Sequence, residues 1–257
     1  MNPTPLLSYL GKLTGHTGGQ VAGSVGAGSW MGHELSKTPN MLPGEMTYMK
    51  LKMGINPFLP VISTPGLNNA YYFPDVEGMP IPEHINYDPK FGKPGILAHE
   101  VGHKLIADGK AGVIMKFLQD KIYGPSRGIS PVLSIPATLY NVRKFGRMGN
   151  PWSGAAIGAG TSGLLGAGHI LPEWKASAIA KERYLSDRFG ERQNNTLLNS
   201  ALSTYLAGQM SGPAVLGALT SMERSKFLPK LLRIKEGDAI MAPGLLKRLT
   251  KLFSRFK

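Results

Sequence analysis

Glycine and proline are concentrated in blocks without charge, and these blocks limit what the chain can fold into. The 257 residues include 33 Gly and 20 Pro. Residues 13–33 and 152–172 carry no charge and have a Gly every few positions. From Met53 to Pro74, repeated prolines exclude a continuous helix. We therefore expect turns, irregular loops and helices that pack closely through small residues.

The remaining composition excludes several classes of protein. With 42% hydrophobic and 18% charged residues, the chain is neither a disordered polyelectrolyte nor an ordinary polytopic membrane protein. The absence of Cys excludes disulfides, iron–sulfur clusters, thiol nucleophiles and thiolate zinc sites, so any metal must be held by His and carboxylates. The first residues lack the pattern of a secretory signal peptide, and we expect a cytoplasmic origin.

We expect three regions along the chain. Residues 1–52 form a Gly-rich arm, flexible or loosely helical and too weakly hydrophobic for a membrane span. Residues 53–222 form the main domain. Residues 223–257 form a basic tail, with ten Lys and Arg against three acidic residues. These basic residues supply about half of the net charge of +13.

The end of the tail has the pattern of a basic amphipathic helix over residues 245–257. Such a helix fits an anionic membrane surface or the groove of a partner, and it is equally compatible with docking on its own domain. Nucleic acid is not an expected partner, because the basic residues are not interleaved with stacking aromatic side chains.

The main domain is predicted to be α+β and mainly helical. The best strand candidate is the aromatic segment 69–73. Helices are predicted over 96–108, ending at Gly109, over 111–123, ending at Gly124-Pro125, and over 173–188. Residues 152–172 are long enough to cross a bilayer, a marginal span with a Gly-x-x-x-Gly pair at Gly154 and Gly158.

The motif that carries chemistry is His99-Glu100-Val101-Gly102-His103, an H-E-x-x-H sequence inside a predicted helix. Four residues advance a helix by slightly more than one turn, so both imidazoles project from one face and can share one Zn²⁺. Glu100 then lies beside the open coordination position, as the general base of a hydrolase. The alternative is a pair of surface histidines with a salt-bridging Glu, which the apolar surroundings of the motif disfavour.

A hydrolytic zinc site needs a third protein ligand. A compact third His is excluded, because the position it would occupy is Gly109. Asp108 and Asp120 are available, and the first Glu after the motif is Glu173. Glu173 follows Pro172, which we expect at a helix start, and a Glu in a first helical turn is more often a surface residue that compensates the helix dipole.

The motif and the segment Leu171-Pro172-Glu173-Trp174-Lys175-Ala176-Ser177-Ala178-Ile179-Ala180 together resemble the gluzincin metallopeptidases, in particular the YugP-like membrane neutral zinc metallopeptidases. The segment 197–207 resembles the apolar stretch that follows the third ligand in that family. The resemblance implies a minigluzincin-like core, Zn²⁺ bound by His99, His103 and Glu173, and Glu100 as base. It also implies membrane-embedded or membrane-apposed regions, which the Gly-rich helices would permit.

The segment Asn69-Ala70-Tyr71-Tyr72-Phe73-Pro74 is similar to an edge strand of the more distant HtpX-like and CAAX-prenyl-protease-like families. That similarity implies that Asn69, Ala70 and Tyr71 hold a peptide substrate by backbone pairing. Two positions depart from the patterns. Lys104 follows the second ligand where the YugP-like proteins have Ala, and Ser177 replaces an Asp that partners a ligand His in the HtpX-like branch, a role that Asp187 could take instead.

The predicted function is a zinc-dependent, membrane-associated endopeptidase. A developing oxyanion needs one more donor, and Tyr184, three helical turns after Glu173, or His169, just before it, could supply it. A second hypothesis is a membrane-inserting or assembly protein, for example one carried in a virion, with a structural or vestigial metal site. A third is a metallohydrolase that acts on a non-peptide amide such as a cell-wall crosslink.

Overall fold

The computed structural model describes residues 4–75, 80–186 and 190–222. The chain divides into two compact units, each made of segments distant in sequence. The bundle unit comprises Met1–Val21, Ser134–Ser162 and Met210–Lys257, and the sheet unit comprises Ala22–Leu133 and Gly163–Gln209. The predicted tail, 223–257, lies outside the described residues.

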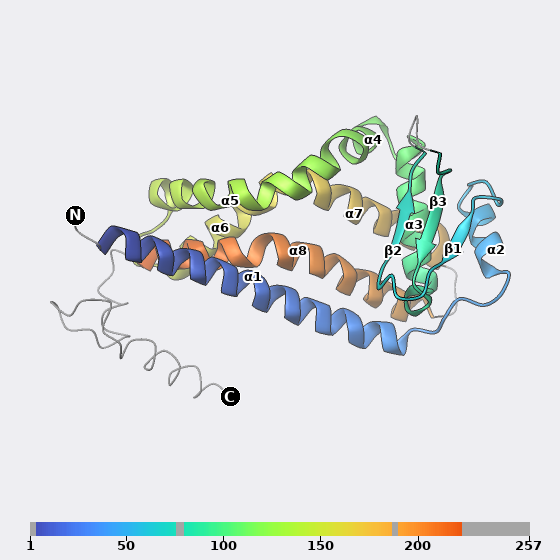
Figure 1. Cartoon of the computed structure of the whole chain (residues 1–257), viewed down its shortest axis with the longest axis horizontal. Coiled ribbons are helices and arrows are strands. Elements are labelled where there is room, and N and C mark those ends of the chain that lie inside the picture. Colours follow the sequence, from blue (N-terminus) through green and yellow to red (C-terminus); the bar gives the residue numbers. More distant parts are fainter. Residues whose placement is uncertain (1–3, 76–79, 187–189, 223–257) are drawn as a thin grey trace. The chain divides into compact units, whose positions relative to one another are not determined.

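The described chain is mainly helical with one small sheet, as expected (Figure 1). The helices are α1 (Thr4–Lys37), α2 (Glu45–Lys52), α3 (Pro94–Ala107), α4 (Val113–Phe117), α5 (Tyr123–Phe145), α6 (Pro151–Leu165), α7 (Ala167–Ala180) and α8 (Glu191–Met222). Two π-helical turns, Leu118–Ile122 and Lys181–Leu185, and a 3₁₀ turn, Pro89–Phe91, complete the helical elements. The strands are β1 (Val61–Ser63), β2 (Ala70–Phe73) and β3 (His84–Tyr87).

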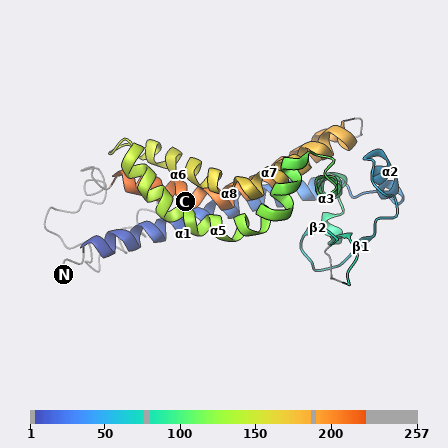
Figure 2. The same ribbon diagram turned by 90° about the horizontal axis from the view of Figure 1, so that it is seen from above.

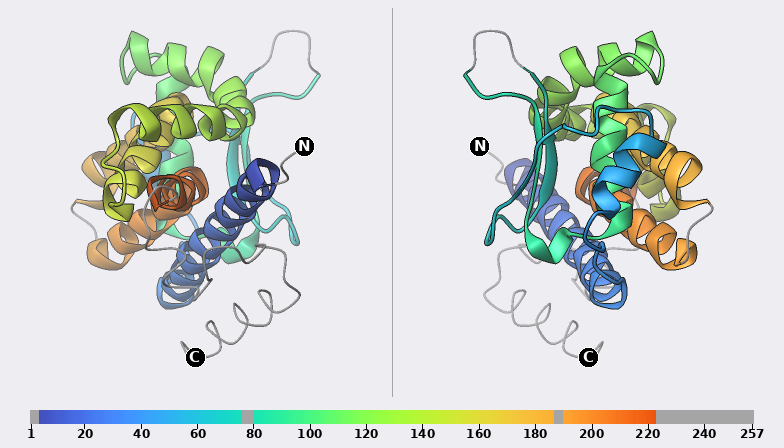
Figure 3. Two further views of the ribbon diagram at one scale, coloured as in Figure 1. Left: turned by 90° about the vertical axis from the view of Figure 1, so that its left-hand side faces the viewer. Right: turned by 90° about the vertical axis from the view of Figure 1, so that its right-hand side faces the viewer.

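The sheet has the order β1-β3-β2, with β1 parallel and β2 antiparallel to β3. The predicted aromatic strand is confirmed as β2, and it is an edge strand of this sheet. Asp88 holds the loop before it, because one carboxylate oxygen accepts the N–H groups of Gly66 and Asn68. β2 runs beside α3 (Figure 3), and the backbone N–H of Tyr72 on β2 donates to Glu100 on α3.

Helix α3 lies at the centre of the sheet unit. It begins with Pro94 and ends before Gly109, whose φ of 73° suits glycine, so the predicted helix is confirmed. Its apolar face, which includes Leu97, Val101 and Leu105, is buried in the core. A Cβ on Gly102 would stand 2.6 Å from the carbonyl oxygen of Ala176, so α3 and α7 pack in backbone contact at this point.

Small residues also join the helices of the bundle unit. A Cβ on Gly154 would lie 2.2 Å from the carbonyl oxygen of Gly217, and one on Gly158 would lie 2.0 Å from that of Pro213. The Gly-x-x-x-Gly pair of α6 is thus the face that packs on α8 (Figure 2). Within the described residues, no helix is both long and apolar enough to cross a membrane.

The Gly-rich segment 12–34, expected to be flexible or loosely helical, belongs to a regular helix, α1. Two local predictions are wrong. Gly124-Pro125 does not end a helix, because α5 continues through both residues from the π-helical turn before it. Pro172 lies inside α7, which begins at Ala167, so Glu173 is not in a first helical turn. The argument for Glu173 as a dipole-compensating surface residue therefore fails.

Candidate metal centre

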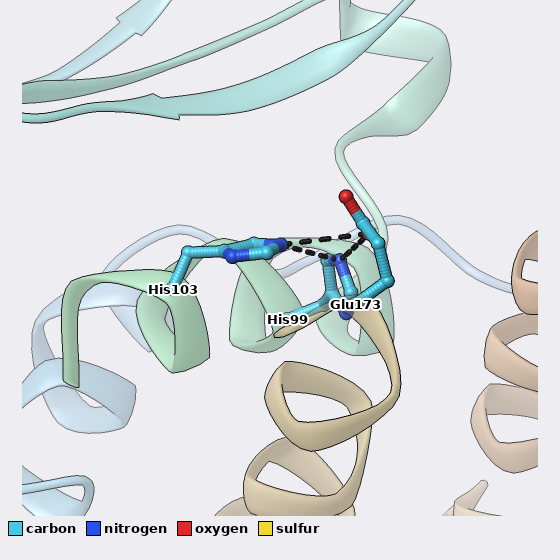
Figure 4. A group of neighbouring side chains, drawn as sticks. All are labelled: His99, His103 and Glu173. Carbon is cyan, nitrogen blue, oxygen red and sulfur yellow. Dashed lines mark hydrogen bonds and ion pairs between the residues drawn. The ribbon is translucent and has the colours of Figure 1, made fainter. Parts of the chain in front are cut away.

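The contact between α3 and α7 brings His99, His103 and Glu173 together at one point (Figure 4). One carboxylate oxygen of Glu173, Oε2, lies 3.1 Å from Nε2 of His99 and 3.5 Å from Nε2 of His103. The two Nε2 atoms are 3.1 Å apart, and the two rings are nearly perpendicular. Three potential ligand atoms, each from a different side chain, thus form a small triangle.

The dimensions of this triangle fit a metal ion. Ligands at about 2.0–2.2 Å from a tetrahedral Zn²⁺ stand about 3.3–3.6 Å from one another, close to the three separations observed. Two imidazoles and a carboxylate suit Zn²⁺ and also other first-row divalent ions, so this donor set does not identify the metal. The described residues therefore contain a His-His-Glu group that could hold one metal ion.

Hydrogen bonds orient both imidazoles. The side-chain amide of Gln119 donates to the backbone carbonyl of His103 at 2.9 Å, and its oxygen lies 2.9 Å from Nδ1 of the same residue. That nitrogen must then carry the proton, which leaves the lone pair of Nε2 directed at the centre. Nδ1 of His99 lies 3.0 Å from Oγ of Ser177, so the serine serves as the partner for which a carboxylate was expected. Asp187, the other candidate, lies outside the described residues.

Glu173 is also held from outside the triangle. Its second oxygen, Oε1, accepts a hydrogen bond from the hydroxyl of Tyr123, at the start of α5. Burial raises the pKa of Glu173, but the neighbouring His103 and His99 hold this pKa well below its usual value. Burial lowers the pKa of His103, and the Glu173 carboxylate outweighs it, raising this pKa to about 9.

Glu100 lies between the metal group and the sheet. Its side chain is buried, and Oε2 accepts the backbone N–H of Tyr72 on β2 at 2.8 Å. Burial raises the pKa of Glu100, although His99 and His103 oppose this shift. A carboxylate with a raised pKa, fixed beside a cluster of potential ligands, has the placement that a general base requires.

A cavity of about 800 Å³ opens over these groups. Asn69, Ala70 and Tyr71, which we expected to bind substrate, all line it. Its walls also include Tyr123, Arg127 and Tyr205. A smaller recess of about 180 Å³ shares His99 and Glu173 with this cavity. Part of its wall is apolar, formed by Phe91, Ile96, Leu198, Ala201 and Leu202.

Lys104, the cation next to the second ligand, is held away from the metal group. Its ammonium group bonds to Glu83 at 2.9 Å and to Asp108 at 2.5 Å. Burial lowers its pKa, but these two carboxylates raise it above the usual value. Lys104 therefore joins α3 to the segment before β3, and Asp108 is engaged at the cavity rim and not among the ligands.

The two residues proposed as oxyanion donors lie elsewhere. The hydroxyl of Tyr184 donates to Glu45 at 2.6 Å, and Nδ1 of His169 lies 3.2 Å from Oγ of Ser126. Neither residue lines the cavity. Tyr184 sits in a π-helical turn, and its predicted position assumed a continuous α-helix after Glu173.

Sequence reasoning missed Gln119, Tyr123, Arg127 and Tyr205. Nothing in the sequence indicated Tyr123, because Gly124-Pro125 predicted a helix end and no pattern placed this residue near Glu173. Tyr205 was within reach, since it lies in the apolar stretch that carried the family resemblance. Burial, followed by the charge of Glu173, raises its pKa well above the usual value.

No protein-family model, curated protein or solved structure matches this chain. The chemistry of the centre is therefore argued from its geometry and from the residues of the motif.

Proposed function

We propose that this chain is a zinc-dependent endopeptidase with a minigluzincin-like core, associated with a membrane. The observation that carries the proposal is the meeting of His99, His103 and Glu173 at a cavity, with Glu100 beside them. In this proposal the three residues hold Zn²⁺, which when bound lowers the pKa of a water molecule and polarises a carbonyl group.

The edge of β2 supports binding of an extended peptide. Ala70 pairs with Tyr87 and Tyr72 with Ile85 on one side of the strand, and among the described residues no strand pairs with the other side. A peptide laid along that side would pass over Glu100 and the metal group. This arrangement favours the expected role of Asn69, Ala70 and Tyr71 in binding substrate.

Glu100 is the proton carrier of the proposed hydrolysis. Its carboxylate accepts a proton from the attacking water and delivers it to the leaving amine. Its raised pKa favours the first step, because a more basic carboxylate takes the proton from water more readily. The second step remains favourable because an amine is a stronger base than a carboxylate. Tyr123, Tyr205 and Arg127 line the same cavity and are placed to stabilise developing negative charge, in place of Tyr184 and His169.

The competing hypothesis is a membrane-inserting or assembly protein with a structural or vestigial metal site, and the geometry argues against the structural form of that site. Structural zinc sites have four protein ligands, whereas the group found among the described residues contains three. The same donor set suits hydrolysis of a non-peptide amide. Assays with a peptide substrate and with a non-peptide amide distinguish these two activities.

A test compares Glu100→Gln with wild type and with Glu182→Gln, which changes an exposed glutamate outside the cavity. All three proteins are loaded with zinc, and cleavage of unfolded casein is followed by mass spectrometry of the fragments. We expect Glu182→Gln to cleave like wild type and Glu100→Gln to lose about 10²-fold or more of the rate. Equal rates for wild type and Glu100→Gln at equal zinc content would refute the proposed mechanism.

A further inference from the structure

The turn that joins α5 to α6 carries large apolar side chains that face solvent. Phe145 ends α5, Met148 lies in the turn and Trp152 lies in the first turn of α6, with exposed fractions of 63%, 37% and 83%. Tyr140, earlier on α5, is 60% exposed. We call these four residues the aromatic tip. All belong to the bundle unit, and the turn lies at one end of the two helices (Figure 1).

The backbone under the aromatic tip is fixed by hydrogen bonds. The side-chain oxygen of Asn150 accepts the N–H groups of Trp152 and Ser153, which caps α6. The backbone N–H of Gly149 donates to the carbonyl of Ser221 at 2.7 Å, and the Ser221 hydroxyl donates to the carbonyl of Asn150 at 3.0 Å. The exposed side chains therefore stand on an ordered turn, and such a patch marks an interaction site.

Three cations lie in the same stretch of chain as the aromatic tip. The ammonium group of Lys144 lies 5.5 Å from the ring centre of Tyr140 and 5.2 Å from that of Phe145. Arg143 and Arg147 flank it, and within the described residues none of the three cations forms an ion pair. The sequence from 121 to 172 contains no Asp or Glu, so no carboxylate of this segment offsets their charge.

We propose that the aromatic tip docks on the surface of a bilayer containing anionic phospholipid. Trp and Tyr side chains favour the interfacial layer of a bilayer, Phe and Met enter its apolar boundary, and Lys and Arg pair with lipid phosphates. The C-terminal segment 223–257 is a poor occupant of the same surface, because it is itself strongly positive. The proposal rests on the membrane association proposed above, and it is independent of the peptidase mechanism and of the expected anchor at 245–257.

The test is flotation of the full chain with vesicles of phosphatidylcholine, with and without phosphatidylglycerol. We expect binding to the anionic vesicles, reduced about tenfold or more by the double substitution Phe145→Ser and Trp152→Ser. The matched control is Phe58→Ser with Val113→Ser, which removes two side chains of similar exposure, 87% and 84%, from the sheet unit. This control and Glu100→Gln should float like wild type, and circular dichroism verifies that each variant is folded.

Three results would overturn the proposal. The first is equal flotation of wild type and the aromatic-tip double variant on anionic vesicles, which would place any anchor elsewhere in the chain. The second is equal binding of wild type to vesicles with and without phosphatidylglycerol, which would show that the cations do not contribute to binding. The third is a wild-type chain that binds no vesicles and sediments as a dimer, together with a double variant that sediments as a monomer. The aromatic tip would then join two copies of the chain.

Discussion

At the scale of single residues, the centre is defined as much by the groups that hold the ligands as by the ligands themselves. Gln119 fixes the protonated nitrogen of His103, Ser177 partners His99, and Tyr123 donates to Glu173. The H-E-x-x-H motif predicted the two histidines and the base. It could not predict their partners, because these come from segments whose path depends on the fold.

Loss of the Gln119 contacts should weaken metal binding. In Gln119→Leu, Nδ1 of His103 loses its acceptor and the ring loses its preferred tautomer. We expect the dissociation constant for zinc to rise about 10–100-fold, the usual effect of removing such a partner. Competition with a zinc-binding dye measures it, and Gln193→Leu, an exposed site on α8, is the control. Equal affinities for both variants would show that Gln119 does not orient His103.

His16 should make the bundle unit sensitive to acid. It is 6% exposed, Nε2 has no hydrogen-bond partner among the described residues, and burial lowers its pKa below the usual value of 6.5. The unfolded chain therefore takes up a proton before the folded chain does, and the folded state loses stability as pH falls below about 6.5.

Urea unfolding at about pH 7.5 and about pH 5.5 tests whether the folded state loses stability as pH falls, because His titrates between these values. Wild type should lose more free energy of unfolding over that interval than His16→Gln does. His33→Gln, an exposed position on the same helix, is the control. An equal loss in wild type and His16→Gln would contradict the expectation.

At the scale of elements, close helix contacts position the centre. Glu173 reaches the histidines because α7 packs in backbone contact with α3 at Gly102. Gly102→Ala should force the helices apart, cost about 1–3 kcal/mol of the free energy of unfolding and lower zinc occupancy. Gly28→Ala, where a new Cβ meets nothing within 4 Å, should leave both unchanged or slightly raise the stability. Urea unfolding and metal analysis of both variants measure this, and wild-type behaviour of Gly102→Ala would contradict it.

Close packing of glycine also positions α6, and this helix contains both a packed and an unpacked glycine that can be compared. A Cβ at Gly158 would lie 2.0 Å from the carbonyl oxygen of Pro213, whereas one at Gly160 meets nothing within 4 Å. Gly158→Ala should lower the free energy of unfolding by about 1–3 kcal/mol, and Gly160→Ala should raise it by about 0.5–1 kcal/mol. Thermal or urea unfolding separates them. Equal stabilities would mean that α6 does not pack on α8 through this face.

Element boundaries were less predictable than element types. The motif helix and the edge strand follow local rules, namely a proline start, a glycine end and an aromatic run, and both are confirmed. The path of α5 through Gly124-Pro125 and the position of Pro172 inside α7 were predicted wrongly. Gly124-Pro125 was expected to end a helix and Pro172 to begin one, but both prolines lie inside helices of the folded chain. Packing there overrides the local preference of proline for helix ends.

At the scale of the whole molecule, the sequence predicted a mainly helical chain with a small sheet, and the described residues confirm it. The division into units was not predictable from linear composition, because each unit combines distant segments. The three potential ligands nevertheless belong to a single unit, the sheet unit. The metal centre is therefore formed entirely within the sheet unit.

The most direct measurement is zinc content by elemental mass spectrometry on wild type, Glu173→Ala and Glu182→Ala, purified in parallel and reconstituted with zinc. We predict about one zinc per chain in wild type and in Glu182→Ala, and a sharp reduction in Glu173→Ala, because the remaining histidines supply two of the three ligands. Absence of zinc from reconstituted wild type, or full occupancy in Glu173→Ala, would contradict the three-residue centre.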